Sequence, residues 1–222
     1  DVYKRQKYTD DDKVVVNIDL TDSGGAGLPS QQYLALGSGF VVKYSVGVGT
    51  AGGGTVDGYS DLKARVIVKR GSTVISEFQD AEFVGVTAGQ SYTFDASPYL
   101  KDATAYTVQV EAQATYQGGT LMKTATAKVT MVAMTLETTY SVGNGLADGG
   151  YRNDVNIPFT AKGTSGEKNI YYRVNGGQAF TLGLSAGSGV QQKNVTIPLT
   201  QMQEGTNVVE AYAQHENSGV VS

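Results

Sequence analysis

Short stretches in which apolar and polar residues alternate follow one another along most of the chain, and no segment shows the 3.6-residue period of an amphipathic helix. Alternation with a period of two is typical of half-buried strands. Gly, Asn and Asp separate these stretches at intervals of roughly 8–12 residues, which favours antiparallel β-sandwiches of the immunoglobulin-like type. The predicted strands are 14–20, 40–48, 64–69, 73–78, 91–94, 106–116, 124–140, 155–161, 169–174, 179–184, 194–199 and 207–214.

Two turn sequences predict β-hairpins. Within Ile170–Leu182, Asn175 and Gly176 supply the two positive-φ residues that a type I′ turn requires. Lys69–Ser72 lies between two β-rich runs in the same way, with different turn residues. Both hairpins join strands that are adjacent in the sequence.

The pattern around these hairpins recurs at a spacing of about 100 residues, the length of one immunoglobulin-like sandwich. Val110–Ala114 is matched by Val209–Ala213, and Tyr44–Val46 by Phe159–Ala161. A repeat at such a period indicates tandem modules, and chance similarity between β-strand sequences is the alternative. We expect modules at 33–133 and 134–222, with an insertion at 47–59 in the first.

The run Thr124–Tyr140 contains no Gly, Pro, Asn or Asp and is longer than ordinary strands of 3–10 residues. It is therefore interpreted as two strands joined near Ala133, the last of one module and the first of the next. A junction without a flexible spacer restricts bending, so we expect a stiff rod.

The two ends indicate a fragment of a longer protein. Asp1–Gln6 resembles the translated adaptor of a shotgun sequencing library, with a native basic leader as the alternative, and 1–32 is expected to add one strand and the flexible spacer Thr21–Gly27. The strand Val14–Leu20 belongs either to the first module or to a preceding one. Gly219–Ser222 is interpreted as the start of a strand, and the second module lacks a counterpart of the closing strand Lys123–Val132.

Composition narrows the possible chemistry. The chain has 222 residues, no Cys, one His and a net charge of −4 with 17% charged residues. The absence of Cys excludes disulfides, thiolate nucleophiles and cysteine-based zinc sites. The weak negative charge makes nucleic acid an unexpected partner. No apolar run reaches the roughly 20 residues that span a bilayer, so no membrane insertion is predicted.

No catalytic, cofactor or metal motif stands out. His215, at a predicted strand end, is interpreted as a solvated surface residue, and no Gly-x-Ser-x-Gly motif accompanies it. The glycine-rich stretch Gly47–Gly58 lacks the Gly-Lys-Ser/Thr end of a phosphate-binding loop, so we interpret it as an exposed, mobile connection. Asp10–Asp12 lacks the spacing of a calcium loop. We therefore predict no enzyme activity, no cofactor and no metal.

The fourteen tyrosines are the remaining functional signal, because their amphipathic rings suit stacking on sugars or contact with proteins. Tyr171 and Tyr172 are adjacent on a strand, so only one of them can face the core. The alternative is that tyrosine simply fits a half-buried pleat. The candidate binding residues, chosen because they lie in or beside loops, are Tyr33, Asp57, Tyr59, Tyr116 and Tyr151.

From Gln32 onward the chain resembles the tandem immunoglobulin-like proteins of phages and prophages of gut Bacteroidota. The resemblance is one of pattern, without a signature motif, and implies modules of virion tails, baseplates or fibres, or related surface proteins, with no catalytic residues to carry over. The stretches that carry it are Ser38–Ser45, Val86–Ser97, Lys128–Tyr140, Asn156–Phe159 and Glu204–Tyr212.

The predicted function is a non-catalytic spacer or display module of a longer phage tail-associated or bacterial surface protein, located on the virion or the cell surface. Its expected partners are neighbouring modules of the same chain and other virion proteins. The alternative is an adhesin-like module that binds carbohydrate or a host-surface glycan through the tyrosines and the loop Gly47–Tyr59.

Overall fold

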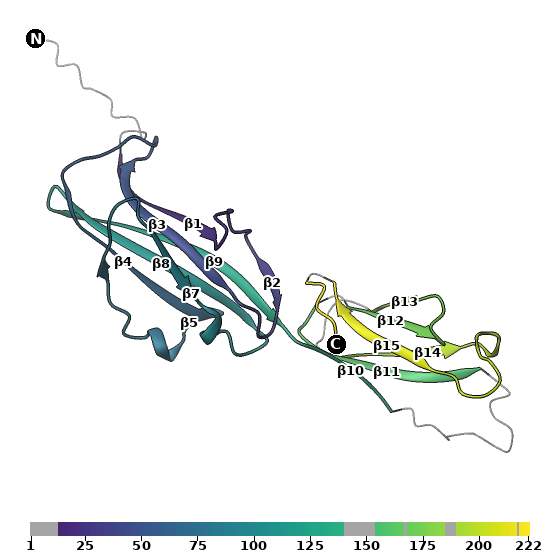
Figure 1. The fold of residues 1–222 in the computed structure, drawn as a ribbon. Coiled ribbons are helices and arrows are strands. Elements are labelled where there is room, and N and C mark those ends of the chain that lie inside the picture. Colours follow the sequence, from purple (N-terminus) through teal and green to yellow (C-terminus); the bar gives the residue numbers. More distant parts are fainter. Residues whose placement is uncertain (1–12, 140–153, 167, 185–189, 217) are drawn as a thin grey trace, which may run out of the picture. The chain divides into compact units, whose positions relative to one another are not determined.

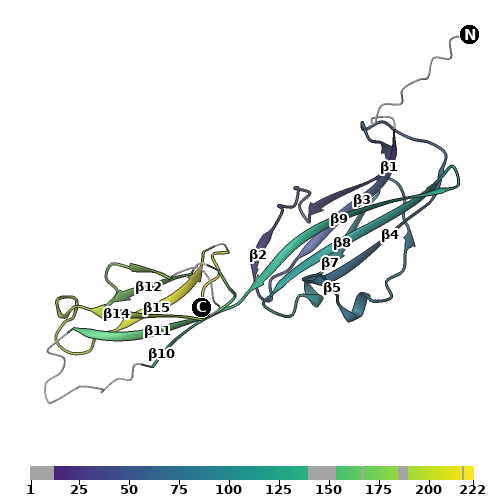
Figure 2. The same ribbon diagram turned by 180° about the vertical axis from the view of Figure 1, so that it is seen from behind.

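The computed structural model describes residues 13–139, 154–166, 168–184, 190–216 and 218–222. These residues form antiparallel strands and short 3-10 helices, which confirms the all-β prediction (Figures 1 and 2). They divide into two compact units. The first unit contains the described residues up to Gln32, Gly37–Lys101 and Ala105–Thr130, and the second contains Tyr33–Leu36, Asp102–Thr104 and Met131–Ser222.

The first unit is built from two sheets. One has the order β1-β3-β7, with β1 at Val14–Asp22, β3 at Val41–Thr50 and β7 at Ser91–Asp95. The other has the order β2-β9-β8-β4-β5, and β6 pairs with β4. Its strands are β9 (Gly119–Val132), β8 (Ala105–Tyr116), β4 (Tyr59–Arg70), β5 (Thr73–Val74), β6 (Val84–Gly85) and β2 (Gln32–Ala35). Of β2, only Gln32 is counted with the first unit, and Tyr33–Leu36 belong to the second.

The two sheets of the first unit bury their facing sides against each other. Tyr44 and Val46, two residues apart on β3, pack with Val110 and Ala112, two residues apart on β8. Burial of each such Val contributes about 1.5–3 kcal/mol, so the alternating pattern itself specifies the inner face of each strand. Two antiparallel sheets with these strand orders form a sandwich of the immunoglobulin-like type.

The described residues of the second unit also form two antiparallel sheets. One sheet has the order β10-β11-β14, with β10 at Met134–Thr138, β11 at Val155–Gly163 and β14 at Val190–Ile197. The other has the order β13-β12-β15, with β13 at Phe180–Leu184, β12 at Lys168–Val174 and β15 at Val209–His215. The core between them contains Val155, Ile157, Phe159 and Ala161 from β11 and Ile170, Tyr172 and Val174 from β12.

The junction and hairpin predictions are confirmed at the level of strands. β9 ends at Val132 and β10 begins at Met134, so Ala133 alone separates them. Asn175 and Gly176 have φ values of 51° and 69°, and the Gly177 N–H donates to the Val174 carbonyl at 2.9 Å. Gly71, with a φ of 59°, turns β4 into β5.

Two predicted strands are too long. The run 73–78 is strand only at Thr73–Val74, and the 3-10 helix η2 (Ser76–Phe78) follows, because the Phe78 ring packs edge-on against Tyr99, with ring centroids 4.8 Å apart. Tyr99 lies in the 3-10 helix η3 (Ser97–Tyr99). The run 194–199 leaves the sheet after Ile197, since Pro198 has no N–H for the ladder, and η4 (Leu199–Gln201) follows.

The glycine-rich connection is partly strand, which corrects its interpretation as a loop. Gly47–Thr50 belong to β3 and pair with β1. Residues 50–54 then form a tight turn, in which the Gly54 N–H donates to Thr50 Oγ1 at 2.8 Å. A Cβ at position 49 would lie 2.7 Å from the Gly54 carbonyl oxygen, so this turn requires Gly49.

The N-terminal strand and its turn belong to the first unit. β1 pairs with β3, and Val16 is buried in the core of this unit, which settles the question that the sequence left open. The predicted spacer Thr21–Gly27 is instead a hydrogen-bonded turn, because Asp22 Oδ1 accepts the N–H groups of Gly24 and Ala26, both at 2.9 Å. Asp1–Gln6 and Asp10–Asp12 lie outside the described residues.

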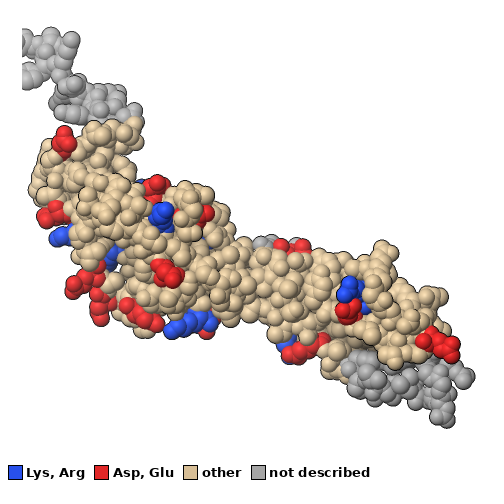
Figure 3. All heavy atoms as spheres, viewed as in Figure 1, with Lys and Arg blue, Asp and Glu red and all other residues tan. Residues whose placement is uncertain are grey.

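The described residues contain no helix long and apolar enough to cross a membrane. On the face shown in Figure 3, Lys and Arg side chains are scattered among Asp and Glu and do not gather into a basic patch.

Candidate functional site

Three of the predicted binding residues lie at one end of the first unit. Tyr59 and Tyr116 are opposite each other in the β4–β8 ladder, and Asp57 precedes β4 by two residues and is exposed. Both tyrosines are only half-buried, and Tyr59 packs against the core of this unit. Gln117 Nε2 donates to the Tyr116 hydroxyl at 3.3 Å. The pairing of Tyr59 with Tyr116 was not predicted from the sequence, because it depends on the register between β4 and β8.

The other two candidates do not join this group. Tyr33 is half-buried and packs against the core of the second unit, with its ring centroid 6.0 Å from that of His215. Its position gives it a packing role. Tyr151 lies outside the described residues.

A partly exposed pair of aromatic rings with polar neighbours lies on the outer face of the β13-β12-β15 sheet. Tyr171 and Tyr212 are register partners whose rings stack with centroids 5.1 Å apart and planes 13° apart. Tyr212 is 43% exposed. Tyr172 is buried instead, which confirms that only one of the two adjacent tyrosines faces the core. We call the outward pair Tyr171–Tyr212 the tyrosine pair.

An ion pair flanks the tyrosine pair. Arg173 donates from Nε to Glu210 Oε2 at 2.6 Å and from Nη2 to Glu210 Oε1 at 3.0 Å. The hydrogen bond from Arg173 lowers the pKa of the Glu210 carboxyl, and the same contact raises the pKa of the guanidinium. The surface therefore combines two stacked rings with a fixed bidentate ion pair, groups that suit stacking on a sugar ring and hydrogen bonding to its hydroxyls.

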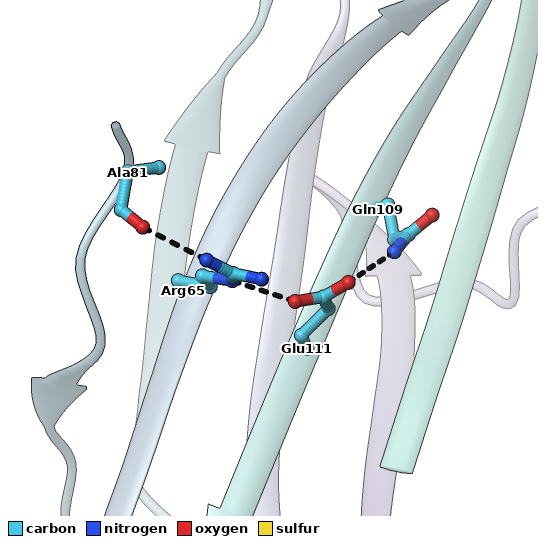
Figure 4. A network of polar contacts seen from close by, with 4 residues as sticks. All are labelled: Arg65, Ala81, Gln109 and Glu111. Carbon is cyan, nitrogen blue, oxygen red and sulfur yellow. Dashed lines mark hydrogen bonds and ion pairs between the residues drawn. The ribbon is translucent and has the colours of Figure 1, made fainter. Parts of the chain in front are cut away.

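The first unit has an Arg–Glu pair in the corresponding ladder, but its surroundings differ (Figure 4). Arg65 Nε donates to Glu111 Oε2 at 2.6 Å, and Arg65 Nη1 donates to the Ala81 carbonyl at 3.1 Å. The guanidinium also lies 4.6 Å from the centroid of the Phe83 ring, and Glu111 accepts a further bond from Gln109. These contacts hold the segment around Ala81 on the sheet, so this pair is structural.

His215 is buried, which corrects its interpretation as a solvated surface residue. Its exposed fraction is 0%, and it continues the inward-facing positions of β15 after Ala213. Its Nε2 lies 3.1 Å from the Ser165 carbonyl oxygen, and its Nδ1 lies 3.2 Å from Ser218 Oγ. A ring so enclosed, with both nitrogens in hydrogen bonds, has no access to an external substrate. Ala211, Ala213 and His215 are each two residues apart on β15, so they lie on the same face of the strand. This spacing could have predicted from the sequence that His215 faces inward.

Lys168 faces His215 from the neighbouring strand and is also buried, with 1% exposed. Its Nζ donates to the Gly166 carbonyl at 3.2 Å, and burial lowers the pKa of the ammonium group. Gly166 has a φ of 140°, and a Cβ there would lie 2.5 Å from His215 Nε2. The loop before β12 can therefore close over the imidazole only with glycine at this position.

Within the described part of the chain, no group of three or more His, Asp or Glu side chains is arranged to hold a metal ion. Scans against protein-family models and against characterised proteins give no match.

Searches of solved structures find distant similarities. A Salmonella α-2-macroglobulin mutant is 14% identical over 97% of this chain and 16% of its own, with a TM-score of 0.35. The three N-terminal domains of the bacteriophage RB49 highly immunogenic outer capsid protein are 16% identical over 94% of this chain and 66% of their own, with a TM-score of 0.39. A Legionella pneumophila DUF4785 family protein is 8% identical over 93% of this chain and 54% of its own, with a TM-score of 0.31. The fold assignment rests on this chain's own strand order.

Proposed function

We propose that this chain is a non-catalytic structural spacer of a longer phage tail-associated or bacterial surface protein, built from two immunoglobulin-like modules in tandem. The observation that supports the proposal most directly is the passage from β9 to β10 through a single residue, Ala133. A spacer has to transmit orientation from one module to the next, and a one-residue connection leaves few backbone torsions to absorb bending.

Ala133 is itself held within the second unit. Its N–H donates to Thr164 Oγ1 at 3.1 Å, and its carbonyl accepts the Thr164 N–H at 3.0 Å. The same carbonyl lies so close to Gly163 that a Cβ there would be 2.0 Å away. Gly163 has a φ of 137°. Two hydrogen bonds with Thr164, one to its side chain and one to its backbone, and a tight glycine contact thus fix the connecting residue, which supports the proposal of a restricted hinge.

The lack of Cys makes this proposal easy to test, because introduced cysteines are the sole labelling sites. Ser60 and Lys193 are both exposed, so the double variant Ser60→Cys/Lys193→Cys accepts one spin label in each unit. We expect a narrow distance distribution by pulsed electron resonance, and a broader one after insertion of a Gly/Ser linker behind Ala133. The variant Thr164→Val, which removes one bond to Ala133, is expected to give an intermediate width.

A distribution that is already broad in the uninserted chain, and that the linker does not widen, would contradict the spacer role. The labelled chain without the insertion is the matched control, because its two label sites and their local environments are unchanged.

The tyrosine pair favours a second candidate function, binding of a glycan on a host or cell surface. An exposed pair of stacked rings next to an ion pair has no counterpart at the same ladder positions of the first unit, where Lys63 faces Gln113. Glycan-array binding that is lost in Tyr212→Ala but kept in Tyr59→Ala would support it. Binding lost in Tyr59→Ala alone would favour the end of the first unit instead.

A further inference from the structure

The two corresponding strands β8 and β15 differ in what lies beside them. β8 pairs with β4 on one side and with β9 on the other, from Ala105 to Tyr116. β15 pairs with β12 from Val209 to His215, and on its other side the ladder formed by the described residues is with the segment 220–222 alone. Along Val209–Tyr212 no strand among the described residues pairs with this second edge of β15, which we call the open edge.

The segment 220–222 already follows the path of a strand. The His215 N–H donates to the Val220 carbonyl at 2.9 Å, the Ser222 N–H donates to the Ala213 carbonyl at 2.9 Å, and Val221 bridges to Gln214. This is an antiparallel ladder that runs toward Val209. In such a ladder the backbone groups of alternate residues point to the same side. The N–H and C=O groups of Ala211 and Val209 therefore point to the open edge, as those of Ala213 and His215 do.

The burial of matched residues shows the effect of the open edge. Val110 and Ala112 on β8, which β9 flanks, are both 0% exposed. Val209 and Ala211 occupy the corresponding positions in the Val-Glu-Ala-x-Ala sequence of β15, pack against the core of the second unit and are only partly buried. Val208 beside them is 54% exposed. At the open edge, backbone groups without a ladder partner among the described residues thus lie beside partly exposed apolar side chains.

We propose that the edge of β15 along Val209–Tyr212 is a strand-acceptor site, and that its occupant is an extended strand that runs on from Ser222, antiparallel to β15. The second and fourth residues of that strand hydrogen-bond to Ala211 and Val209, in the register that Ser222 and Ala213 set. Main-chain hydrogen bonds supply the recognition, as in other cases of strand addition to a sheet edge, and apolar residues at alternate positions cover the core. The inference depends on this register and is independent of the spacer role.

The test extends the full chain at its C-terminus. In the β8–β9 ladder Ala114 faces Leu121, which makes Met122–Lys128 the segment that occupies the corresponding path in the first unit. A chain that carries a copy of this seven-residue segment after Ser222 is compared with the unextended chain. We expect hydrogen exchange of the Val209 and Ala211 amides to slow by about tenfold or more, because they gain partners in the ladder.

The matched control carries the same extension with proline at its second and fourth positions, which removes the two N–H donors and leaves the length unchanged. We expect no protection of Val209 and Ala211 in this chain. Equal exchange in the extended and unextended chains would overturn the proposal. So would protection that rises with protein concentration together with dimer formation, since a second copy would then occupy the edge. Neither outcome alters the label distances that test the spacer role.

Discussion

Lys168 and His215 lie directly opposite each other on β12 and β15, and both side chains are buried. The pair occupies the end of the core where the loop Ser165–Gly166 and Ser218 close over the imidazole. Because burial lowers the pKa of the Lys168 ammonium group, the stability of the second unit depends on the protonation of Lys168.

Stability of the second unit is expected to rise with pH in the alkaline range through Lys168. Because burial lowers the pKa of its ammonium group from 10.5, the charged form is disfavoured in the folded state. This penalty is fully present below the folded-state pKa and disappears as pH rises from that value toward 10.5. In urea titrations that follow an Ile170 methyl signal by NMR, Lys168→Met should lose this pH dependence.

The exposed Lys193 is the control for this measurement, and Lys193→Met should retain the slope of the unaltered chain. All other titratable groups are the same in the Lys168→Met and Lys193→Met chains, so the comparison isolates the two lysines. Identical slopes in all three proteins would show that Lys168 does not contribute.

Gly166→Ala is expected to destabilise the second unit by about 2–4 kcal/mol. The substitution combines a positive φ of 140° with a Cβ that would lie 2.5 Å from His215 Nε2, so either the loop or the imidazole must move. Gly47→Ala, where a Cβ meets nothing within 4 Å, is the control and should change the free energy of unfolding by less than about 0.5 kcal/mol. Chemical denaturation measures both, and comparable losses would refute the steric explanation.

The two Arg–Glu pairs are expected to differ in their contribution to stability. Arg65→Ala should lower the free energy of unfolding of the first unit by about 1–2 kcal/mol, because it also removes the bond to the Ala81 carbonyl and the contact with Phe83. Arg173→Ala should cost clearly less, since both side chains of its pair are 50% exposed and water screens the interaction. A larger loss for Arg173→Ala would reverse this ranking.

Asn175→Ala is expected to destabilise the second unit by about 1–2 kcal/mol. Asn175 has a φ of 51°, and its side chain donates to Asn207 Oδ1 and accepts the Val208 N–H, both at 2.8 Å. Asn175→Gly keeps the backbone conformation and loses only the side-chain bonds, so it should cost less. Thermal unfolding of the two variants separates the two contributions, and equal losses would assign the whole effect to the hydrogen bonds.

Local rules predicted the features that depend on a few consecutive residues. The alternation in Val155–Ala161 and Tyr106–Tyr116 predicted strands, which the structure confirms, because a period of two is typical of half-buried strands. Asn175-Gly176 identified a hairpin, because few residue pairs adopt two positive φ values. The absence of turn residues around Ala133 identified a junction between two strands.

The features that were missed depend on segments distant in the sequence. The tyrosine pair follows from the register of β12 with β15, and the open edge follows from which strands flank β15. The turn Thr21–Gly27 was interpreted as a spacer because its glycines suggest flexibility, whereas the Asp22 carboxylate orders it.

By itself, the sequence determined that this protein is a chain of antiparallel sandwiches with cores built from alternating Val, Ile, Tyr and Ala, because strand periodicity and turn chemistry are local properties. Only the tertiary structure decided that His215 is buried, since its burial requires Ser165, Gly166 and Ser218 to close over the ring. A polar side chain is stable inside when other segments supply its hydrogen bonds, and no local pattern records those partners.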